Sequence, residues 1–274
     1  MAYQFASVRR AASTETAGVQ PTDPFLTRLL SISDLTREQA RIVTLMQGPP
    51  RLLPAHAQFD QPGEPSAYVI RDGWAFAYTL LANGERQVVG FLLPGDLVRV
   101  CRPAESTTEL YVETITDTVV SEVSMAAVRG AAQQWPAIFE LFLRLQAQAQ
   151  AALIEQLVDL GRRDSRARVA QLLLKLERRL TPIGRAGPDG YYFPISQYLI
   201  ADALGLTSIH VNRVLRSLRE EESVTVRHER VTIHDRARLR AIAGEDDSVI
   251  DGAAAITSIG RRHGQAEGRS RIAS

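Results

Sequence analysis

Two spacings of apolar residues divide the chain into a strand-rich part and a helical part. From Arg51 to about Met125, short β-rich runs alternate with turn residues: AYVI, WAFAYTLL, QVVGFLL, ELYVETI and TVVSEVS. Asn83-Gly84 and Pro94-Gly95-Asp96 separate such runs, and glycine and asparagine there tolerate positive φ. No helix-length periodic segment interrupts the region, so we expect an antiparallel roll or barrel rather than a parallel sheet.

Helical spacing appears on both sides of this region. Start signals and apolar positions predict a short helix between about Ser31 and Gln47, and a long helix near Trp135 that reaches Leu160. The long helix carries a 4-3-4-3 stripe typical of a coiled-coil seam, formed by Ile138, Phe142, Leu145, Ala149 and Ala152. That stripe predicts a dimer interface, with packing on the chain's own roll as the alternative. A second stripe, Leu153, Leu157 and Leu160, is then available for packing within the chain.

The helical spacing resumes beyond a joint at Gly161. A helix from Ala167 to Leu180 ends before Pro182. Ser196 can cap a helix through Leu204, Gly205 supplies a turn, and Thr207 can cap a second helix through about Arg219. The stretch SVTVRHERVTIHD then predicts a hairpin with its turn near His228. These elements in this order predict a winged helix-turn-helix.

The outward face of the second helix has side chains suited to a DNA major groove. Arg213 and Arg216 can donate to guanine, Asn212 can pair with adenine, and Ile209 can contact a thymine methyl group. Ser208 and His210 lie near the helix N-terminus, where the helix dipole favours phosphate. Arg227, His228 and Arg230 on the hairpin are candidate phosphate contacts. Ser196 and Thr207, at the helix starts, complete the candidate DNA-binding set.

The charge distribution agrees with a nucleic-acid partner. From Arg162 to Arg240 there are 16 Arg and Lys against 9 Asp and Glu, whereas the whole chain of 274 residues has a formal charge of +1. A basic segment joined to an acidic one favours binding of nucleic acid by the former. The sequence has neither a long apolar run nor a signal-peptide core, so we expect a cytoplasmic protein without a membrane partner.

The succession of β-rich region, long helix, ISQYLIADALGLTSIHVNRVLRSLREE and hairpin resembles the CRP/FNR family of bacterial transcription regulators, from about Phe25 to Gly244. The resemblance implies a homodimer in which a β-roll senses a signal and two recognition helices read a palindromic site in double-stranded DNA, with RNA polymerase as a further partner. It aligns Ser208, Ile209, Asn212 and Arg213 with the family's recognition positions, Arg213 being the base-reading arginine. The family commonly has glutamate, which reads cytosine, where this chain has Ile209, and often glycine where it has Ser223.

The expected fold class is therefore α+β: an antiparallel β-roll of the cyclic-nucleotide-binding type, a dimerisation helix and a winged helix-turn-helix. The expected divisions are a flexible arm (1–24), a β-roll sensor domain (25–130), the dimerisation helix (131–162), a DNA-binding domain (163–244) and a flexible tail (245–274).

Two kinds of signal known in the family do not fit this sequence. The Gly-Glu-Leu cassette and the later Arg-Ser or Arg-Thr pair of cyclic-nucleotide binders are missing from LVRVCRPAESTTELYVETI. A single cysteine, Cys101, excludes a four-cysteine iron–sulfur site within one chain. Arg99 and Arg102 would lower the pKa of that thiol, which makes Cys101 a candidate redox sensor. A haem ligated by His56 or Cys101 is a weaker alternative, and we predict no cofactor or metal.

Two other function classes fit the sequence less well. No common catalytic motif such as Gly-x-Ser-x-Gly or His-Glu-x-x-His occurs, so we do not expect an enzyme. The acidic run Glu220, Glu221 and Glu222 beside the basic face leaves a second possibility. In that alternative the chain is a ligand-binding or protein-interaction module whose helix-turn-helix no longer reads DNA.

Overall fold

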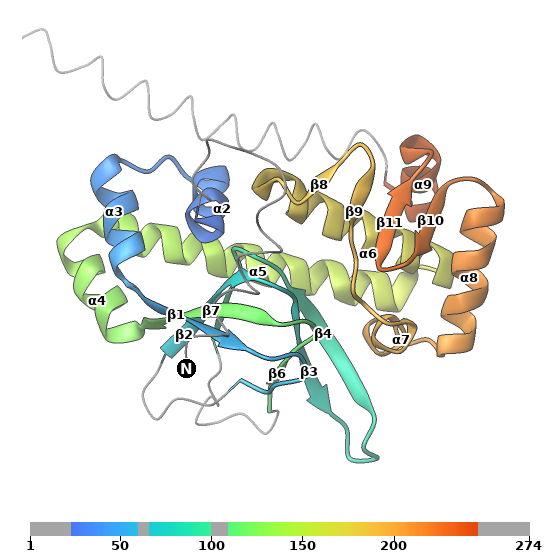
Figure 1. Cartoon of the computed structure of the whole chain (residues 1–274), viewed down its shortest axis with the longest axis horizontal. Helices are drawn as coiled ribbons and strands as arrows, with labels where there is room; N and C mark the ends of the chain where they lie inside the picture. Colours follow the sequence, from blue (N-terminus) through green and yellow to red (C-terminus); the bar gives the residue numbers. More distant parts are fainter. Residues whose placement is uncertain (1–22, 60–65, 100–108, 246–274) are drawn as a thin grey trace, which may run out of the picture.

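The computed structural model describes residues 23–59, 66–99 and 109–245. Within these ranges a β-roll is flanked on one side by short helices and on the other by a helical domain with a small sheet, and one long helix runs behind both (Figure 1). The elements of the first part are α2 (Pro24–Ile32), α3 (Arg37–Leu45), β1 (Gln47–Leu53), β2 (Ser66–Asp72), β3 (Ala75–Leu80), β4 (Arg86–Leu92), β5 (Leu97–Arg99), β6 (Tyr111–Thr114), β7 (Thr118–Ser124), α4 (Met125–Gln134) and α5 (Pro136–Arg162). The remaining elements are α6 (Ser165–Leu180), the 3₁₀ turn η1 (Thr181–Ile183), β8 (Ala186–Gly187), β9 (Gly190–Tyr192), α7 (Gln197–Leu204), α8 (Ser208–Glu220), β10 (Val224–Arg227), β11 (Arg230–Ile233) and α9 (Arg236–Ala243).

The β-roll consists of two antiparallel sheets, as the alternating pattern predicts. One sheet has the order β1-β7-β2-β5 and the other β4-β3-β6. Apolar side chains from both sheets, among them Ile70, Val112 and Val120, form a common core. Strand β1 was not predicted because it contains Pro49 and Pro50. Proline cannot donate to a ladder, and β1 accommodates it at the sheet edge, where the register with β7 shifts.

Helix α3 lies within the range predicted for a short helix, Ser31 to Gln47, and a further helix, α2, which was not predicted, precedes it. Helix α2 ends at Ile32, α3 begins after the Thr36 cap, and Gln47 already belongs to β1. The Thr36 hydroxyl accepts from the Gln39 backbone N–H, and the Gln39 side chain accepts from the Thr36 N–H. This reciprocal cap fixes a second helix start within the segment. Phe25 and Leu29 anchor α2 in a core shared with α5.

The long helix packs on its own chain through the stripe that we assigned to a partner. Ile138 is fully buried, and Phe142 and Leu145 are half-buried against the core formed by α2, α4 and the roll. Ala149 and Ala152 are exposed. The prediction that Ile138 faces a partner is therefore wrong, and the alternative of packing within the chain holds for this half of the helix. Leu153 and Leu157, expected to pack inward, are instead exposed.

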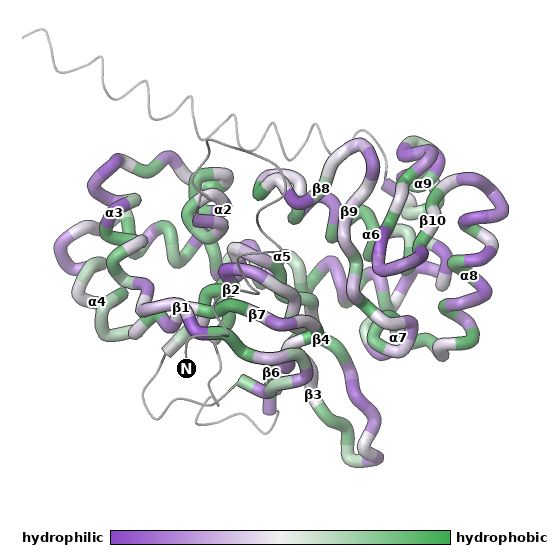
Figure 2. The backbone as a smooth tube through the Cα atoms, viewed as in Figure 1, coloured by the Kyte–Doolittle hydropathy of each residue, from purple (hydrophilic) through white to green (hydrophobic). Residues whose placement is uncertain are grey.

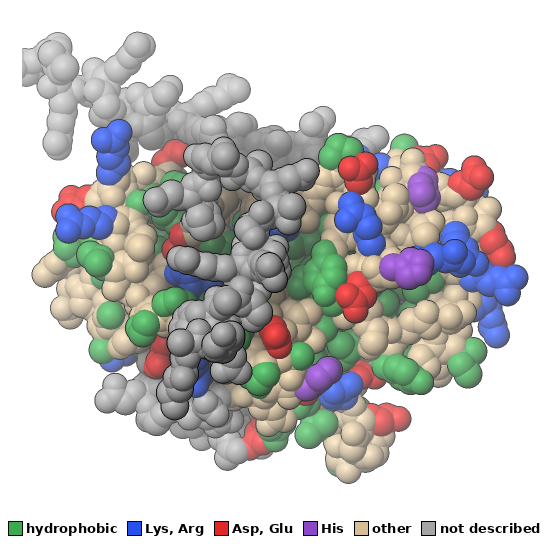
Figure 3. Space-filling model, viewed as in Figure 1, with side chains coloured by type: hydrophobic (Ala, Val, Ile, Leu, Met, Phe, Trp, Pro, Cys, Tyr) green, Lys and Arg blue, Asp and Glu red, His purple; other side chains and the backbone are tan. Residues whose placement is uncertain are grey.

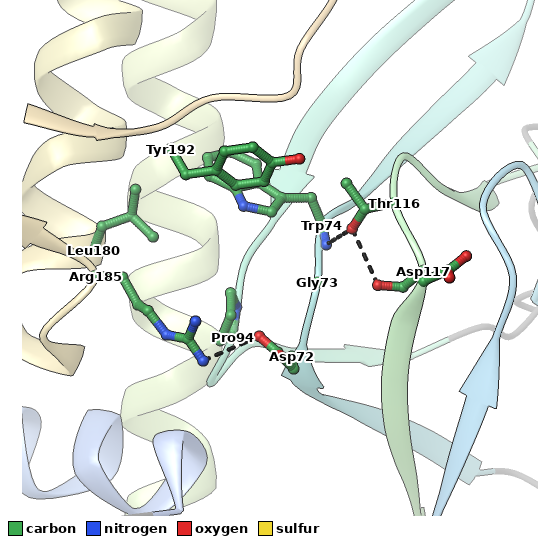
Figure 4. A pocket seen from close by; sticks show the side chains of 9 residues that line it. All are labelled: Asp72, Gly73, Trp74, Pro94, Thr116, Asp117, Leu180, Arg185 and Tyr192. Carbon is green, nitrogen blue, oxygen red and sulfur yellow. Dashed lines mark hydrogen bonds and ion pairs between the residues drawn. The ribbon is translucent and has the colours of Figure 1, made fainter. Parts of the chain in front are cut away.

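The helical domain packs directly against the β-roll. A single apolar core runs from Trp74, Phe76 and Phe91 of the roll to residues of α6, α7 and α8, and Figure 2 shows the apolar segments that meet there. The rings of Trp74 and Phe193 meet edge to face, 6.5 Å apart. Beside them Arg185 donates to Asp72 at 3.0 Å, next to a cavity of about 290 Å³ (Figure 4). The orientation of the helical domain relative to the roll is thus defined by apolar and charged contacts.

Candidate nucleic-acid interface

The helix-turn-helix is built as its caps predict. Ser196 accepts from the Leu199 N–H at the start of α7, and Thr207 accepts from the His210 N–H at the start of α8, both at 3.2 Å. Gly205 ends α7 in the left-handed conformation at φ +61°, which residues with a Cβ rarely adopt. Val211, Val214 and Leu218 are buried and fix the face that α8 turns inward.

The outward face of α8 presents the predicted base-reading residues. Ile209 is 74% exposed, and Asn212 and Arg213 are also exposed. Within the described part of the chain Arg213 has no ion-pair or hydrogen-bond partner, so its planar fork of five N–H donors is free. Asn212 donates one amide hydrogen to the Gln197 side chain at 3.2 Å. Its other N–H and its carbonyl oxygen remain for the two bonds that an adenine edge accepts and donates.

Two residues of the predicted set are held differently. Arg216 donates through Nε to Glu220 one turn further along α8 at 2.8 Å, and this hydrogen bond raises the pKa of Arg216. The ion pair occupies Nε and leaves the N–H groups of the two Nη atoms for a base or a phosphate. His210 does not point outward: its Nε2 lies 2.8 Å from the Ser165 hydroxyl at the start of α6. We therefore assign His210 to orienting α8 on α6. Ser208 is half-buried on the first turn of α8.

The hairpin β10–β11 forms the wing beside α8. His228 and Glu229 occupy its two-residue turn with φ of +50° and +54°, the combination of a type I′ turn, and both are exposed. Arg227 is exposed and, within the described residues, unpaired, whereas Arg230 donates to the Asp189 carbonyl at 3.0 Å. Figure 3 shows Arg side chains (blue) and His side chains (purple) gathered over this hairpin and α8. Arg227 is therefore the better placed of the two arginines for a phosphate.

The end of α8 explains how the chain tolerates Ser223. The left-handed conformation falls on the preceding residue, Glu222, with φ +54°. Ser223 is fully buried and donates its hydroxyl to the Leu218 carbonyl at 2.7 Å. Glu221 accepts from Arg166 on α6, from Ser217 and from Arg238 on α9. The acidic run therefore helps to hold α8 on its neighbours.

Sequence reasoning missed three features of this interface. Gln197 positions Asn212, and Tyr198 beside it is 71% exposed on the first turn of α7, where a backbone-crossing helix would meet DNA. Helix α9, which packs on α6, was also missed. Its signals were the Asp235 cap and the apolar pair Leu239 and Ala243 at a spacing of four.

The candidate redox sensor Cys101 and its neighbour Arg102 lie outside the described residues.

These elements define a class: a β-roll protein with a winged helix-turn-helix whose recognition face is exposed. Residues 167–242 match the model of the Crp-like helix-turn-helix domain. The chain is 29% identical over 178 residues to the nitrogen fixation regulation protein FixK of Bradyrhizobium diazoefficiens, covering 65% of this chain and 74% of that one. It is 30% identical over 170 residues to the transcriptional activator protein FnrL of Cereibacter sphaeroides, covering 61% and 68%.

Solved structures give the same result. The structure of FixK2 from Bradyrhizobium japonicum is similar with a TM-score of 0.61 and 27% identity, over 71% of this chain and 96% of that one. A CRP-family transcriptional regulator from Thermus thermophilus is similar with a TM-score of 0.56 and 26% identity, over 71% and 96%. The chain belongs to the CRP/FNR family. It is a DNA-binding transcription regulator, and regulators of this family bind DNA and act as dimers. Among its described helices, none is long and apolar enough to cross a membrane.

Proposed function

We propose that the protein binds a palindromic DNA site as a homodimer, with α8 of each chain in the major groove and the β10–β11 wing on the phosphate backbone. The observation that carries the proposal is the exposed set Ile209, Asn212 and Arg213 on one face of α8. Arg213 reads a guanine through two hydrogen bonds, Asn212 pairs with an adenine, and Ile209 contacts a thymine methyl group. The functional units of this proposal are the β-roll sensor domain (25–130), the dimerisation helix (131–162) and the DNA-binding domain (163–244).

Phosphate contacts surround this base-reading face. Arg227 and His228 on the wing, Ser208 at the dipole end of α8, and Ser196 at the start of α7 face the backbone. The Tyr198 side chain is 71% exposed, and its hydroxyl, which has no partner among the described residues, can donate to a phosphate and extends this set along α7. Phosphate contacts fix the register of the protein on DNA without specifying the sequence.

The dimer interface is the exposed apolar stripe of α5. Phe139, Leu143, Leu153 and Leu157 are each more than half exposed. With Gln146 and Gln150 between them they follow a continuous 4-3 spacing, one residue out of phase with the stripe that begins at Ile138. Such a stripe supports a parallel two-helix seam, with the two glutamines as polar positions that favour one register. Two chains joined here present two recognition helices related by a two-fold axis.

The regulator is not controlled by cyclic nucleotide in this proposal, because the sequence lacks the cassette that holds the ribose and cyclic phosphate. Cys101 is kept as a candidate redox sensor and RNA polymerase as a further partner.

Salt dependence tests the proposal most simply. Binding of the purified protein to labelled duplex DNA is followed by fluorescence anisotropy between about 50 and 200 mM salt. Each phosphate that a cationic side chain neutralises contributes about −0.9 to the slope of log affinity against log salt, so the two Arg227 side chains of a dimer alone predict a loss of about tenfold over that range. An affinity that hardly changes with salt would contradict the proposal and favour the protein-interaction alternative.

A further inference from the structure

A small cavity with three arginines lies at the junction of the roll and the helical domain. Its volume is about 170 Å³, and we call it the junction cavity. Its charged lining comes from α2, the turn after β4 and the end of α6, and Figure 1 shows α2 lying beside the segment that follows α6. Its three arginines are Arg28, Arg178 and Arg179.

One buried carboxylate serves two of these arginines. Asp96 is 4% exposed, and its Oδ2 accepts from the Leu93 N–H at 2.8 Å. Arg28 pairs with one oxygen of Asp96 and Arg179 with the other. Arg179 also donates to the Phe91 carbonyl at 2.9 Å. Two guanidinium groups and one carboxylate leave one positive charge uncompensated at this point.

The three guanidinium groups lie close together and are partly exposed to solvent. Burial, and then repulsion from Arg179, lower the pKa of Arg28 to about 10, and burial lowers the pKa of Arg179 to about 10. The third arginine, Arg178, pairs with Glu245, but Glu245 is shared with Arg240 at 3.5 Å. An added anion would therefore relieve repulsion among several cations.

The remaining features of the cavity indicate the kind of anion. Arginine presents N–H groups in a fork that matches the oxygens of phosphate, and a guanidinium that already makes one or two bonds retains further donors. Gln148 adds an amide from α5, while Ile32, Leu93 and Pro182 form apolar walls. Sites for drug-sized ligands usually exceed about 300 Å³, so this cavity is suited to an anion of few heavy atoms rather than to a nucleotide.

We propose that the junction cavity binds a small oxyanion of the phosphate class, held by Arg28, Arg178 and Arg179. The anion contacts α2 of the N-terminal part and α6 of the DNA-binding part at once. Its binding therefore stabilises the orientation of one on the other. Gly95 fits this close junction, because at φ +90° an added Cβ would lie 2.6 Å from the Pro24 carbonyl oxygen. The site itself does not depend on the proposed function, whereas its coupling to DNA affinity does.

Titration of the full chain with inorganic phosphate, against chloride at equal ionic strength, tests the site. Calorimetry should show saturable binding, and the Tm should rise with phosphate as binding to the folded state requires. Arg178→Gln leaves the Asp96 pairs intact and should weaken phosphate roughly tenfold or more. Asp96→Asn removes the competing carboxylate and should tighten it. Arg185→Gln, at the same junction but outside the cavity, is the matched control and should leave phosphate affinity unchanged.

The absence of saturable phosphate binding, or equal affinity in the wild type and Arg178→Gln, would overturn the proposal. Should Asp96→Asn fail to fold, Arg178→Gln decides alone, because its ion pair with Glu245 is partly exposed. A phosphate monoester that binds more tightly than inorganic phosphate identifies a phosphorylated metabolite as the ligand, and equal affinities identify the free ion. Phosphate binding that leaves DNA affinity unchanged would contradict the coupling between the cavity and DNA binding, but not the phosphate site itself. If the protein failed to bind DNA, the phosphate affinity measured by calorimetry would still test the site.

Discussion

The guanidinium of Arg86, at the start of β4, donates from Nη2 and Nε to the Asp202 carboxylate on α7, over 2.9 and 3.1 Å. The same guanidinium lies over the rings of Phe76 and Tyr78, 5.4 and 5.5 Å from their centroids. Next to it, Gln87 donates to the Ala203 carbonyl at 3.3 Å. The first helix of the helix-turn-helix is thus tied to a strand of the roll by residues 116 positions apart.

Arg86→Gln should lower the free energy of unfolding by about 1–2 kcal/mol, because it removes a partly buried ion pair and its cation–π contacts. Denaturant unfolding at low salt measures the change. Arg185→Gln is the matched control. It breaks a pair in which both side chains are more than half exposed and should cost at most about 0.5 kcal/mol. Equal effects of the two substitutions would contradict a special role for the Arg86–Asp202 contact.

Arg213→Ala should weaken binding to the specific site by about 1–3 kcal/mol and binding to random DNA little, because the lost contact is to a base edge. Arg227→Ala should weaken both alike and reduce the salt slope by about two units, one for each chain of the dimer. Anisotropy titrations of each variant on both DNAs separate the two roles. If Arg213→Ala weakens both DNAs equally, Arg213 contacts phosphate and reads no base.

Leu157→Lys should convert the dimer to monomers, since it places a charge in the proposed seam of α5. Ala149→Lys is the control: Ala149 is also exposed on α5 but belongs to the other stripe. Sedimentation equilibrium over a concentration series gives both association constants. If Ala149→Lys dissociated the dimer and Leu157→Lys did not, the interface would lie on the stripe that contains Ala149, as first expected from the sequence.

Ile209→Glu should change the preferred half-site rather than the affinity for DNA in general. A glutamate at this position accepts from a cytosine amino group, whereas isoleucine offers only apolar contact. Selection of sites by the variant should therefore enrich cytosine at one position of the half-site. An unchanged half-site would show that residue 209 does not reach a base edge.

Glu221 makes the stability of the winged domain depend on pH. Hydrogen bonds from Arg166, and then from Ser217, lower the pKa of this carboxyl below its usual value. Its contribution to stability is therefore present above the unfolded pKa of about 4.3 and is lost as the pH falls through the folded pKa. Glu221→Gln should be less stable than the wild type at neutral pH, and the difference should disappear in acid below the folded pKa. Denaturant unfolding at both pH values measures this, and a difference that persists in acid would contradict it.

The sequence predicts best the elements whose signals are local. The β10–β11 hairpin and the two caps of the helix-turn-helix follow from residues within a few positions of each other, and the structure has them where expected. Strand β1 could not be predicted, because its prolines are tolerated only at a sheet edge that the sequence does not reveal. The phase of α5 was wrong because both of its stripes are apolar, and burial of Ile138 depends on α2 and α4. Contacts such as Arg86 with Asp202 arise from tertiary packing and leave no local pattern.

In the proposed function, a dimer of this chain reads a palindrome through α8. Selection of binding sites from a random DNA pool by the purified protein, at one fixed salt concentration, is the decisive test. The expected result is an enriched inverted repeat whose half-sites are centred about one helical turn apart, roughly 34–36 Å. Each half-site should carry a guanine whose enrichment disappears with Arg213→Ala. Enrichment of a single unrepeated motif, or of none by a protein that is folded and dimeric, would contradict it.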